Sequence, residues 1–311
     1  MFTADSAQHQ VKGLKESFDN ASRATVEMYM NLPAVNMYMS TEATEKYTST
    51  EGLSGTKELG QYETPPTATE NEGYAVTADY TRYGNSILLP ENIYRVEARD
   101  ASIKVDTYLE RQRNDVLTDV KNKLVTTMHY FFNDAFTGSY VTAPDGNSLC
   151  NAAHAWNTSG SSTWDNYATK ALDSDAVDDM EEYGGAFTDA SGKPMPITFD
   201  TIVVKKGSDA ARAARRLFAE GITPTAIADI NIYEGAYTII ETPYITSTNK
   251  NYWFGLSSFL DNPLHVKINE IPTMREPQIL ENEAIRSNVT GFWEVFVANM
   301  PFAVYGSDGT T

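Results

Sequence analysis

Cysteine and histidine carry most covalent and metal chemistry, and this chain has few of them. The only cysteine, Cys150, lies four residues before His154, and the other histidines are His9, His129 and His265. One thiolate and one imidazole cannot close a tetrahedral zinc site, and no second CxxC or HxxxH motif supplies the missing ligands. We therefore predict no metal site. An enzyme that uses Cys150 as nucleophile and His154 as base stays open as an alternative.

One glycine-containing segment, GGAFTDASGKP at residues 184–194, has some features of a phosphate-binding loop. The glycine spacing before Gly192 and Lys193 is wrong for that loop, and Pro194 stands where Ser or Thr is required. No hydrophobic strand precedes the segment. It instead predicts a turn that leads into the strand MPITFDTIVV. We expect no cofactor and no catalytic residue.

Acidic residues dominate the charge of the chain. There are 42 Asp and Glu residues against 24 Lys and Arg, which gives a net charge of −18. Nucleic-acid binding by phosphate neutralisation needs clustered basic side chains, so we expect DNA to be contacted only weakly. The acids at 173–182 have helical spacing rather than the pattern of a calcium loop, and predict a solvated helix face. The one tight basic group is Arg212, Arg215 and Arg216, also on a predicted helix.

Length and composition indicate a globular protein with a substantial core. The chain has 311 residues, 41% hydrophobic residues and 18 tyrosines, enough to bury a sizeable interior. A single cysteine excludes an intramolecular disulfide framework and suits a reducing cytoplasm. No run approaches 18 apolar residues, so we expect no membrane-spanning helix and no membrane partner. We also expect no secretory signal.

The most informative stretch is the arm at residues 60–90 with the segment that follows it. The arm is rich in Gly, Thr and Glu and has few apolar side chains, yet it alternates like a hairpin from Tyr74 to Arg82, after a predicted turn at 70–73. A hairpin with so few apolar side chains cannot form a core of its own, so it must pack against another surface. We expect that partner to be another copy of the chain.

The segment after the arm predicts one uninterrupted helix from Val105 to Phe136. Its apolar residues recur mostly every four positions and form one stripe that faces a core. At 1.5 Å per residue, such a helix would be roughly 48 Å long. The stripe does not follow the strict heptads of a coiled coil. Gly138 is expected to stop the helix.

The rest of the chain predicts a mixture of helices and strands around a long loop at 138–170. A short helix is expected at 19–30, and two more helices are expected to begin after caps at Asp173 or Ser174 and at Ser208. The predicted strands lie at 198–204, 230–233, 237–242, 252–259, 264–270 and 292–305. A polar connection should separate the last two.

This order of parts resembles the major capsid proteins of tailed bacteriophages, which have the Hong Kong 97 fold. SGKPMPITFDTIVVKKGSDAARAARRLF is similar to the strand-turn-helix opening of their axial domain, and NSLCNAAHAWNTSG to a loop after their spine helix. The resemblance implies an α+β fold. Its implied parts are an N-terminal arm at 1–50, an extended loop at 51–95, a peripheral domain with spine helix at 96–165, an axial domain at 166–255, and the peripheral C-terminal strands at 256–311.

The resemblance also implies a function without catalysis: a major capsid protein that self-assembles into the icosahedral shell around the double-stranded DNA of a tailed phage. The implied location is the virion, and the host cytoplasm during assembly. The partners would be the chain itself, in hexamers and pentamers, together with portal and decoration proteins and either a separate scaffolding protein or none. An encapsulin-type nanocompartment, which shares the fold, stays open as an alternative.

We expect the contacts between subunits to involve aromatic and basic side chains of the arm and of the long helix. The candidates are Lys57, Tyr62, Tyr74, Tyr80, Arg82, Tyr83, Arg111 and Arg113. Some capsid proteins of this family form a covalent cross-link from a lysine on the extended loop. Lys57 is the only lysine in the arm proper, and no partner asparagine can be aligned, so we predict no cross-link.

Overall fold

The computed structural model describes residues 11, 15–23, 35–53, 70–97, 105–156, 158, 162–190, 192–218 and 233–310. The chain divides into two compact units. Unit 1 comprises Met1–Glu45, Ala78–Met128 and Val266–Val295, and unit 2 comprises Lys46–Thr77, His129–His265 and Phe296–Thr311. Among the described residues, no helix is both long and apolar enough to cross a membrane.

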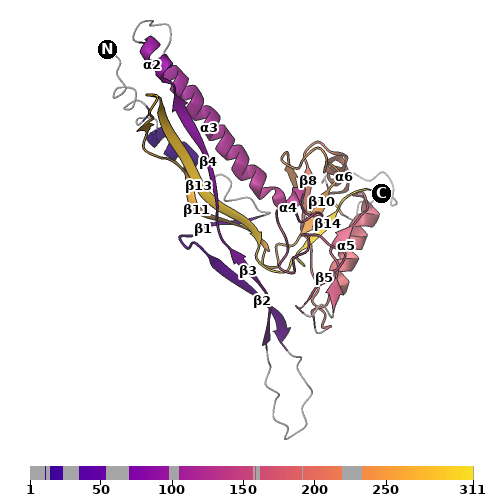
Figure 1. The fold of residues 1–311 in the computed structure, drawn as a ribbon. Coiled ribbons are helices and arrows are strands. Elements are labelled where there is room, and N and C mark those ends of the chain that lie inside the picture. Colours follow the sequence, from indigo (N-terminus) through magenta and orange to yellow (C-terminus); the bar gives the residue numbers. More distant parts are fainter. Residues whose placement is uncertain are drawn as a thin grey trace, which may run out of the picture. The chain divides into compact units, whose positions relative to one another are not determined.

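Unit 1 is built on a long antiparallel hairpin with a helix along it (Figure 1). Strand β13 lies between β11 on one side and β4 on the other, β1 pairs with β11, and the short β12 pairs with β13. Helix α3 contacts β4, and α2 contacts α3. The bounds of these elements are β1 Asn36–Met39, β4 Thr81–Leu89, α2 Glu91–Glu97, α3 Val105–Met128, β11 Leu264–Met274, β12 Gln278–Ile279 and β13 Ile285–Val297.

The register of β4 on β13 decides which side chains face α3. Leu89 pairs with Ile285, and Ile87 pairs with Ser287. Because side chains alternate along a strand, these rows point to one face, and there Ile87, Leu89 and Ile285 join the aliphatic stripe of α3 in a single cluster. The stripe members buried in this cluster are Val105, Leu109 and Val116. The predicted amphipathic helix is therefore confirmed over this stretch.

The N-terminal helix packs onto the same cluster. Residues 15–23 are helical, and the side chain of Phe18 is fully buried. The Asp19 carboxylate accepts a hydrogen bond of 2.8 Å from the backbone N–H of Met274. The helix predicted at 19–30 thus begins earlier than expected, and residues 24–30 lie outside the described residues.

The prediction of one uninterrupted helix to Phe136 is wrong. Helix α3 ends at Met128, and a separate turn of helix, α4 at Tyr130–Asn133, follows His129. The break coincides with the boundary between the units, and Phe131 and Phe132 after it are buried in unit 2. A regular apolar stripe looks the same whether it serves one core or two, so the sequence pattern could not reveal the break.

Unit 2 contains a mixed sheet whose strand order is β7-β14-β10-β8-β9. Strand β10 pairs antiparallel with both β14 and β8, whereas β8 with β9 and β14 with β7 are parallel. The strand bounds are β7 Tyr167–Ala168, β8 Thr201–Lys205, β9 Thr238–Thr242, β10 Trp253–Leu256 and β14 Val304–Ser307. The β8, β9 and β10 predictions are confirmed with shorter bounds, and residues 230–232 lie outside the described residues.

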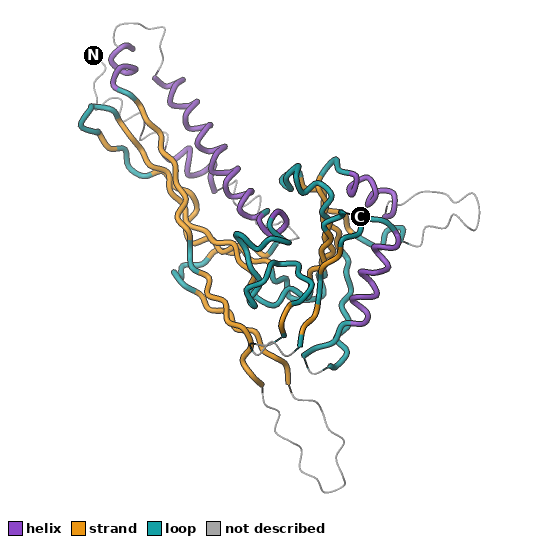
Figure 2. Tube along the Cα trace, turned by 45° about the vertical axis from the view of Figure 1, so that its right-hand side comes forward, coloured by secondary structure: helices purple, strands orange, loops and turns teal. Residues whose placement is uncertain are grey.

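Two helices, α5 at Ser174–Ala186 and α6 at Asp209–Phe218, pack on the same face of this sheet (Figures 1 and 2). Both predicted caps are confirmed. The Asp173 carboxylate accepts from the N–H of Ala176 at 2.9 Å, and the Ser208 hydroxyl accepts from the N–H of Ala211 at 3.0 Å. Each cap satisfies a backbone donor that the first helical turn leaves without a partner.

The core between these helices and the sheet is rich in aromatic rings. Trp253 is fully buried, and Tyr305, Phe199 and Phe187 surround Tyr183. Gly255 on β10 is in close contact with α5: a Cβ there would lie 2.2 Å from the sulfur of Met180, so the Met180 side chain would have to move. Helix α5 therefore sits directly on β10.

Two small ribbons complete the fold. Strands β2 and β3 form a two-stranded hairpin, and β5 pairs with β6. Their bounds are β2 Glu45–Leu53, β3 Glu70–Ala78, β5 His154–Ala155 and β6 Thr163–Trp164. Residues 70–78 of the arm form one strand of a hairpin, but the partner strand β2 precedes the arm, and residues 70–73 belong to β3 and not to a turn. The strand expected from Tyr74 to Arg82 ends at Ala78, and Arg82 belongs to β4, which pairs with β13.

The strand predicted at 292–305 is two strands, and the polar connection before it is largely structured. Strand β13 begins at Ile285 and ends at Val297, and β14 begins only at Val304. Pro301 lies in the break, and because proline has no backbone N–H it cannot donate a hydrogen bond to a neighbouring strand. The polar residues before Phe292 alternate with buried ones such as Val289, so they belong to a long strand with one solvated face.

Candidate assembly surfaces

A buried lysine lies at the base of the β2–β3 hairpin. The side chain of Lys267, on β11, is fully buried, and its Nζ lies 3.2 Å from the carbonyl oxygen of Ala78 and 3.4 Å from that of Ala43. The Glu45 carboxylate is 3.7 Å away. Ala78 ends β3 and Glu45 begins β2. One positive charge therefore binds both chain segments from which the hairpin departs, and we call this group the arm-base latch.

Further hydrogen bonds reinforce the latch. The hydroxyl of Tyr38 donates to Glu45 at 2.9 Å, and the hydroxyl of Ser40 donates to the same carboxylate. The Thr44 hydroxyl donates to Asp79 at 2.8 Å, which ties the two sides of the base together. A buried charge needs such compensation to be tolerated.

The hairpin beyond the latch buries little of itself. Among residues 46–49 and 73–77, no side chain is fully buried. The Ser49 hydroxyl donates to the carbonyl of Tyr74 at 3.0 Å, and Gly73 allows this approach because a Cβ there would lie 2.8 Å from the Ser49 oxygen. Tyr74 packs against the core of unit 2, and the ring of Tyr47 contacts those of His265 and Phe296. That the arm depends on a partner stays a prediction.

A groove of about 160 Å³ lies beside α3, between the helix and the hairpin strands. On its wall the ring of Tyr83 stacks on Trp293 at 4.1 Å between centroids, and the Lys123 ammonium lies 5.2 Å from the Tyr83 ring centre. At the same wall, the Asn85 amide donates to Asp119 at 2.8 Å. Aromatic, cationic and anionic groups thus line one short stretch of unit 1.

Side chains of α3 cover part of the free edge of β4. The Gln112 amide oxygen accepts from the N–H of Leu88 at 3.0 Å, and the Tyr108 hydroxyl donates to the Leu88 carbonyl at 3.5 Å. Gln112 also donates to that hydroxyl at 2.7 Å. An uncovered strand edge is a template for pairing with another chain, so this cover restricts where a neighbour can add a strand.

The predicted contact residues are spread over several places in the structure. Tyr80 is 46% exposed at the turn before β4, where its ring meets Phe292 edge-on at 5.2 Å, and Arg82 is exposed nearby. Tyr83 lines the groove, whereas Tyr74 lies half-buried on β3. The remaining candidates are Arg111, exposed on α3; Arg113, half-buried with a 2.7 Å bond to Ser17; and Lys57 and Tyr62, outside the described residues. Their contacts with a neighbour stay predictions.

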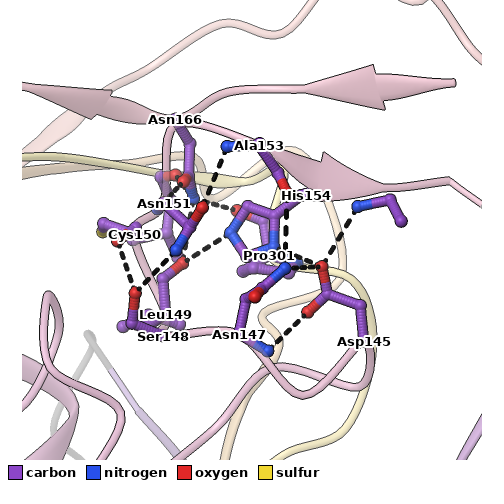
Figure 3. A network of polar contacts seen from close by, with 12 residues as sticks. Asp145, Asn147, Ser148, Leu149, Cys150, Asn151, Ala153, His154, Asn166 and Pro301 are labelled. Carbon is purple, nitrogen blue, oxygen red and sulfur yellow. Dashed lines mark hydrogen bonds and ion pairs between the residues drawn. The ribbon is translucent and has the colours of Figure 1, made fainter. Parts of the chain in front are cut away.

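Unit 2 holds a buried acid–imidazole pair in the loop after α4 (Figure 3). The Asp145 carboxylate lies 2.8 Å from Nδ1 of His154, and both side chains are almost completely buried. It also accepts from Asn147 at 2.9 and 3.1 Å and from the N–H of Ala155 at 3.1 Å. The Asp145 side chain thus ties together both ends of the segment 145–155 within the predicted loop.

Asn166 joins this loop to the sheet (Figure 3). Its amide nitrogen donates to the carbonyls of Leu149 at 3.0 Å and Val304 at 2.9 Å, and its oxygen accepts from the N–H of Asn151 at 2.8 Å. The side chain is fully buried. Its amide nitrogen also lies 3.3 Å from the carbonyl oxygen of Pro301. One amide therefore contacts four backbone groups, two in the irregular loop and two in or just before β14.

The two aspartates that organise this region have lowered pKa values. Burial raises the pKa of Asp145, but hydrogen bonds from His154 and Asn147 and the charge of His154 outweigh it, and the pKa falls below its usual 3.8. Burial also opposes ionisation of Asp134, and hydrogen bonds from Thr137 and from the backbone of residues 139–141 lower its pKa. Both carboxylates act as acceptors for loop donors.

The geometry does not support Cys150 as a nucleophile with His154 as its base. Nδ1 of His154 faces Asp145 and Nε2 lies 3.3 Å from the carbonyl oxygen of Leu149, so both ring nitrogens have oxygen partners. The Cys150 thiol is fully buried, and burial raises its pKa far above the ordinary value. A nucleophilic thiol needs the opposite shift. Among the described residues, no cluster of three or more potential ligands could hold a metal ion.

Several surface features escaped prediction. Tyr140 is 72% exposed and stacks on Tyr130 at 4.7 Å, and Phe259 is 74% exposed. Tyr140 lies in the predicted loop at 138–170, and Phe259 ends the predicted strand 252–259, so the sequence does not mark either as exposed. Lys267 escaped too, since a lone lysine within the predicted strand 264–270 carries no sign of burial.

Comparison with solved structures places the fold among those of phages. The chain aligns over 99% of its length with 90% of a chain from Mycobacterium phage Patience, at 14% identity and a TM-score of 0.51. The alignment with a chain from Microbacterium phage Oxtober96 covers 89% of each chain, at 11% identity and a TM-score of 0.53. The alignment with the capsid of Myoviridae phage XM1 covers 90% of each chain, at 10% identity and a TM-score of 0.52. No protein-family model and no curated protein matches the sequence.

These matches establish the fold class of the chain. The chain has the mixed α/β fold of phage capsid structures over almost its whole length, and the expected fold class is confirmed at that level.

Proposed function

We propose that the chain is a major capsid protein that assembles with copies of itself into the icosahedral shell enclosing the double-stranded DNA of a tailed phage. The observation that carries the proposal is the fold match over 90% of both chains to the capsid of phage XM1. The role requires no catalysis, in keeping with the engaged His154 and buried Cys150.

The weakly buried hairpin and the acidic surface support the same role. In a shell, the extended loop at 51–95 would lie on a neighbour, the spine segment at 96–165 and the strands at 256–311 would form the peripheral part, and 166–255 would form the axial part. Residues 1–50 would be the N-terminal arm, which is separate from the arm at 60–90. The net charge of −18 would let packaged DNA lie against the wall without binding tightly.

The partners we propose are other copies of the chain in hexamers and pentamers, a portal, decoration proteins and a separate scaffolding protein. The location would be the virion, after assembly in the host cytoplasm. No membrane takes part.

Size-exclusion chromatography with negative-stain electron microscopy of the purified full-length chain tests the proposal. We expect closed shells, or hexamer and pentamer rings. A folded monomer at every concentration, also when co-expressed with the scaffolding and portal genes of its genome neighbourhood, would contradict it. Shells that enclose a co-expressed protein cargo would point to a nanocompartment instead.

A further inference from the structure

Strand β9 is the last strand of the unit 2 sheet and has one open side. In the order β7-β14-β10-β8-β9 it pairs, among the described residues, with β8 alone. The N–H of Thr238 donates to the carbonyl oxygen of Asp200, just before β8, at 2.8 Å. Because successive residues of a strand bond alternately to its two sides, the N–H and C=O groups of Ile239 and Glu241 point to the side without a strand.

This open side lacks the protection that two other strand edges of the chain have. Gln112 and Tyr108 cover part of the β4 edge, and β7 is only two residues long. Within the described part of the chain, no side chain hydrogen-bonds to the backbone of Ile239 or Glu241. Four of the five residues of β9 are β-branched, and none is Lys or Pro. Such an edge is a template for a further strand.

The β2–β3 hairpin also lacks a neighbouring strand. Where the structure describes it, it forms a two-stranded sheet of its own. A two-stranded hairpin is marginally stable in water, and a third strand stabilises it. Tyr47 and Tyr74 pack the base half against unit 2. Glu70, at the outer end of β3, lies four residues beyond Tyr74, or roughly 13 Å along the strand.

The open edge of β9 lies among basic side chains. Arg215 of α6 pairs with the glutamate of β9, so side chains of this helix extend to the strand. Arg212 and Arg216 are exposed on the same helix, where Arg212 pairs with the exposed Asp209. Lys206, whose N–H donates to the last residue of β9, is exposed as well. An acidic strand therefore fits this edge best.

The hairpin carries the matching charge. Residues 46–77 contain five glutamates and two lysines. Two of the glutamates, Glu70 and Glu72, belong to β3 and are two positions apart, which is about 6.6 Å along a strand. Arg212 and Arg216 are four positions apart, which is about 6 Å along a helix. The two spacings let two glutamates and two arginines pair one to one.

Two other pairings are disfavoured. Pairing of β9 with β9 of a second copy would bring the basic side chains of both copies together, and like charges in a contact oppose it. The hairpin of the same copy does not pair with β9 in the described part of the structure. A hairpin of a different copy is thus the occupant that fits both the charge and the strand order.

We propose that the outer end of β3 on one copy adds as a further strand to the open edge of β9 on another copy, with its two glutamates facing Arg212 and Arg216. This inference rests on the proposed function as a shell subunit and names the surface on which the hairpin lies. The contact joins two different elements, so it is heterologous. It gives partners to the open backbone groups of β9 and gives the hairpin its third strand.

The contact has a defined centre. Ile239 packs toward the core beneath α6 and Glu241 meets an arginine of that helix, so both side chains face α6. Residues directly opposite each other on neighbouring strands share a face, so the two glutamates of β3 must lie opposite these two residues. Asn71, between the glutamates, then lies opposite Ile240, whichever direction the added strand takes.

Cysteine trapping tests the contact in the full-length chain. Asn71→Cys and Ile240→Cys are made as two separately tagged variants, which are mixed and oxidised. Opposite residues of neighbouring strands have Cα atoms about 4.5–5.5 Å apart, within the range that a disulfide accepts. We expect a disulfide-linked dimer that carries both tags. Its yield should be roughly tenfold above that from Asn71→Cys mixed with Ser86→Cys, an exposed site on the edge strand β4. Cys150 is buried and common to all variants.

Charge reversal shows whether the named side chains select the partner. Glu70→Lys with Glu72→Lys is added to the Asn71→Cys chain, and Arg212→Glu with Arg216→Glu to the Ile240→Cys chain. Each reversal alone should lower the yield of the mixed dimer by about tenfold, the effect of two exposed ion pairs. Both together should restore it, because the charges are again opposite.

Matched controls separate this contact from a general charge effect. Asp115→Lys with Glu281→Lys equals the charge change on the hairpin, and Arg23→Glu with Arg286→Glu equals that on α6, at exposed sites of unit 1. We expect the unreversed yield of mixed dimer from both. Circular dichroism should show parental folding throughout.

The inference fails if the mixed dimer forms no better than the β4 control, or if dimers that carry one tag predominate. It also fails if a chain with both cysteines forms only an internal disulfide, because the hairpin would then fold back onto its own β9. Shells that form without the mixed dimer overturn the inference and leave the proposed function standing. A chain that stays monomeric overturns both.

Discussion

Each of the two compact units buries a charged group, but the surroundings differ. In unit 2, Asp145 and His154 are nine residues apart, and the four hydrogen bonds that Asp145 accepts span 2.8 to 3.1 Å. In unit 1, Lys267 reaches carbonyl oxygens 189 and 224 residues away at 3.2 and 3.4 Å.

The difference teaches how each region depends on the rest of the fold. The Asp145 group is local, so it can form as soon as the loop closes, and its short bonds make it rigid. The arm-base latch exists only when three distant segments have come together, and its longer contacts leave it weaker.

The largest effect should come from removing Asp145. Asp145→Ala removes the acceptor of the buried His154 ring and of the backbone N–H groups of Asn147 and Ala155, and should destabilise unit 2 by about 4 kcal/mol. Hydrogen exchange followed by mass spectrometry on peptides from 141–168 measures this. Asp145→Asn keeps one acceptor oxygen and should lose clearly less. Equal losses for both variants would show that the hydrogen bonds are not what matters.

Lys267→Ala should come second. It leaves the Ala43 and Ala78 carbonyls without their donor and Glu45 without its cation, for a loss of about 3 kcal/mol, mostly in unit 1. Exchange in peptides at 36–45 and 78–89 of unit 1 should rise, while the loop at 141–168 of unit 2 stays protected. The neighbouring exposed Lys46→Ala serves as control and should change little. An equal rise in hydrogen exchange in both units would contradict the claim that the latch stabilises mainly unit 1.

Gln112→Ala should have a smaller effect. It removes the acceptor for the Leu88 N–H and should cost unit 1 about 1 kcal/mol, the ordinary net value of one hydrogen bond. The uncovered β4 edge should also raise aggregation, measured by light scattering. Asn122→Ala, at an exposed site on the same helix, is the control. A variant that is as soluble as the parent would argue against a protective role for this cover.

The smallest effect is a difference in pH dependence between the units. The pKa of Asp145 is lower in the folded chain than its ordinary 3.8, so its contribution to unit 2 is present above pH 3.8 and is lost as the pH falls through the folded value. Burial raises the pKa of Glu294 in unit 1 above 4.5, so unit 1 loses stability as the pH rises through that region.

Acid titration followed by hydrogen exchange distinguishes the two signs. Asp145→Asn should reduce the loss of stability at low pH in unit 2 alone. Glu294→Gln should reduce the loss of stability at rising pH in unit 1 alone. Parallel curves for both units would refute this part of the comparison.

The sequence predicts what is local and misses what is long-range. The caps at Asp173 and Ser208 and the apolar stripe of α3 follow from neighbouring residues, so they were correctly predicted. The break at His129 depends on a second core far along the chain. Lys267 is buried only because β2, β3 and β11 converge on it. The predicted contact residues on β4 and α3 share a unit, but their partners would lie on another copy.

A cryo-electron microscopy reconstruction of the particles formed by the full-length chain tests the central claim most directly. The account predicts a closed shell in which the hairpin at 46–77 lies on a neighbouring copy and unit 2 repeats around ring centres. Particles without regular rings, or a hairpin that folds back onto its own subunit and touches no neighbour, would contradict it.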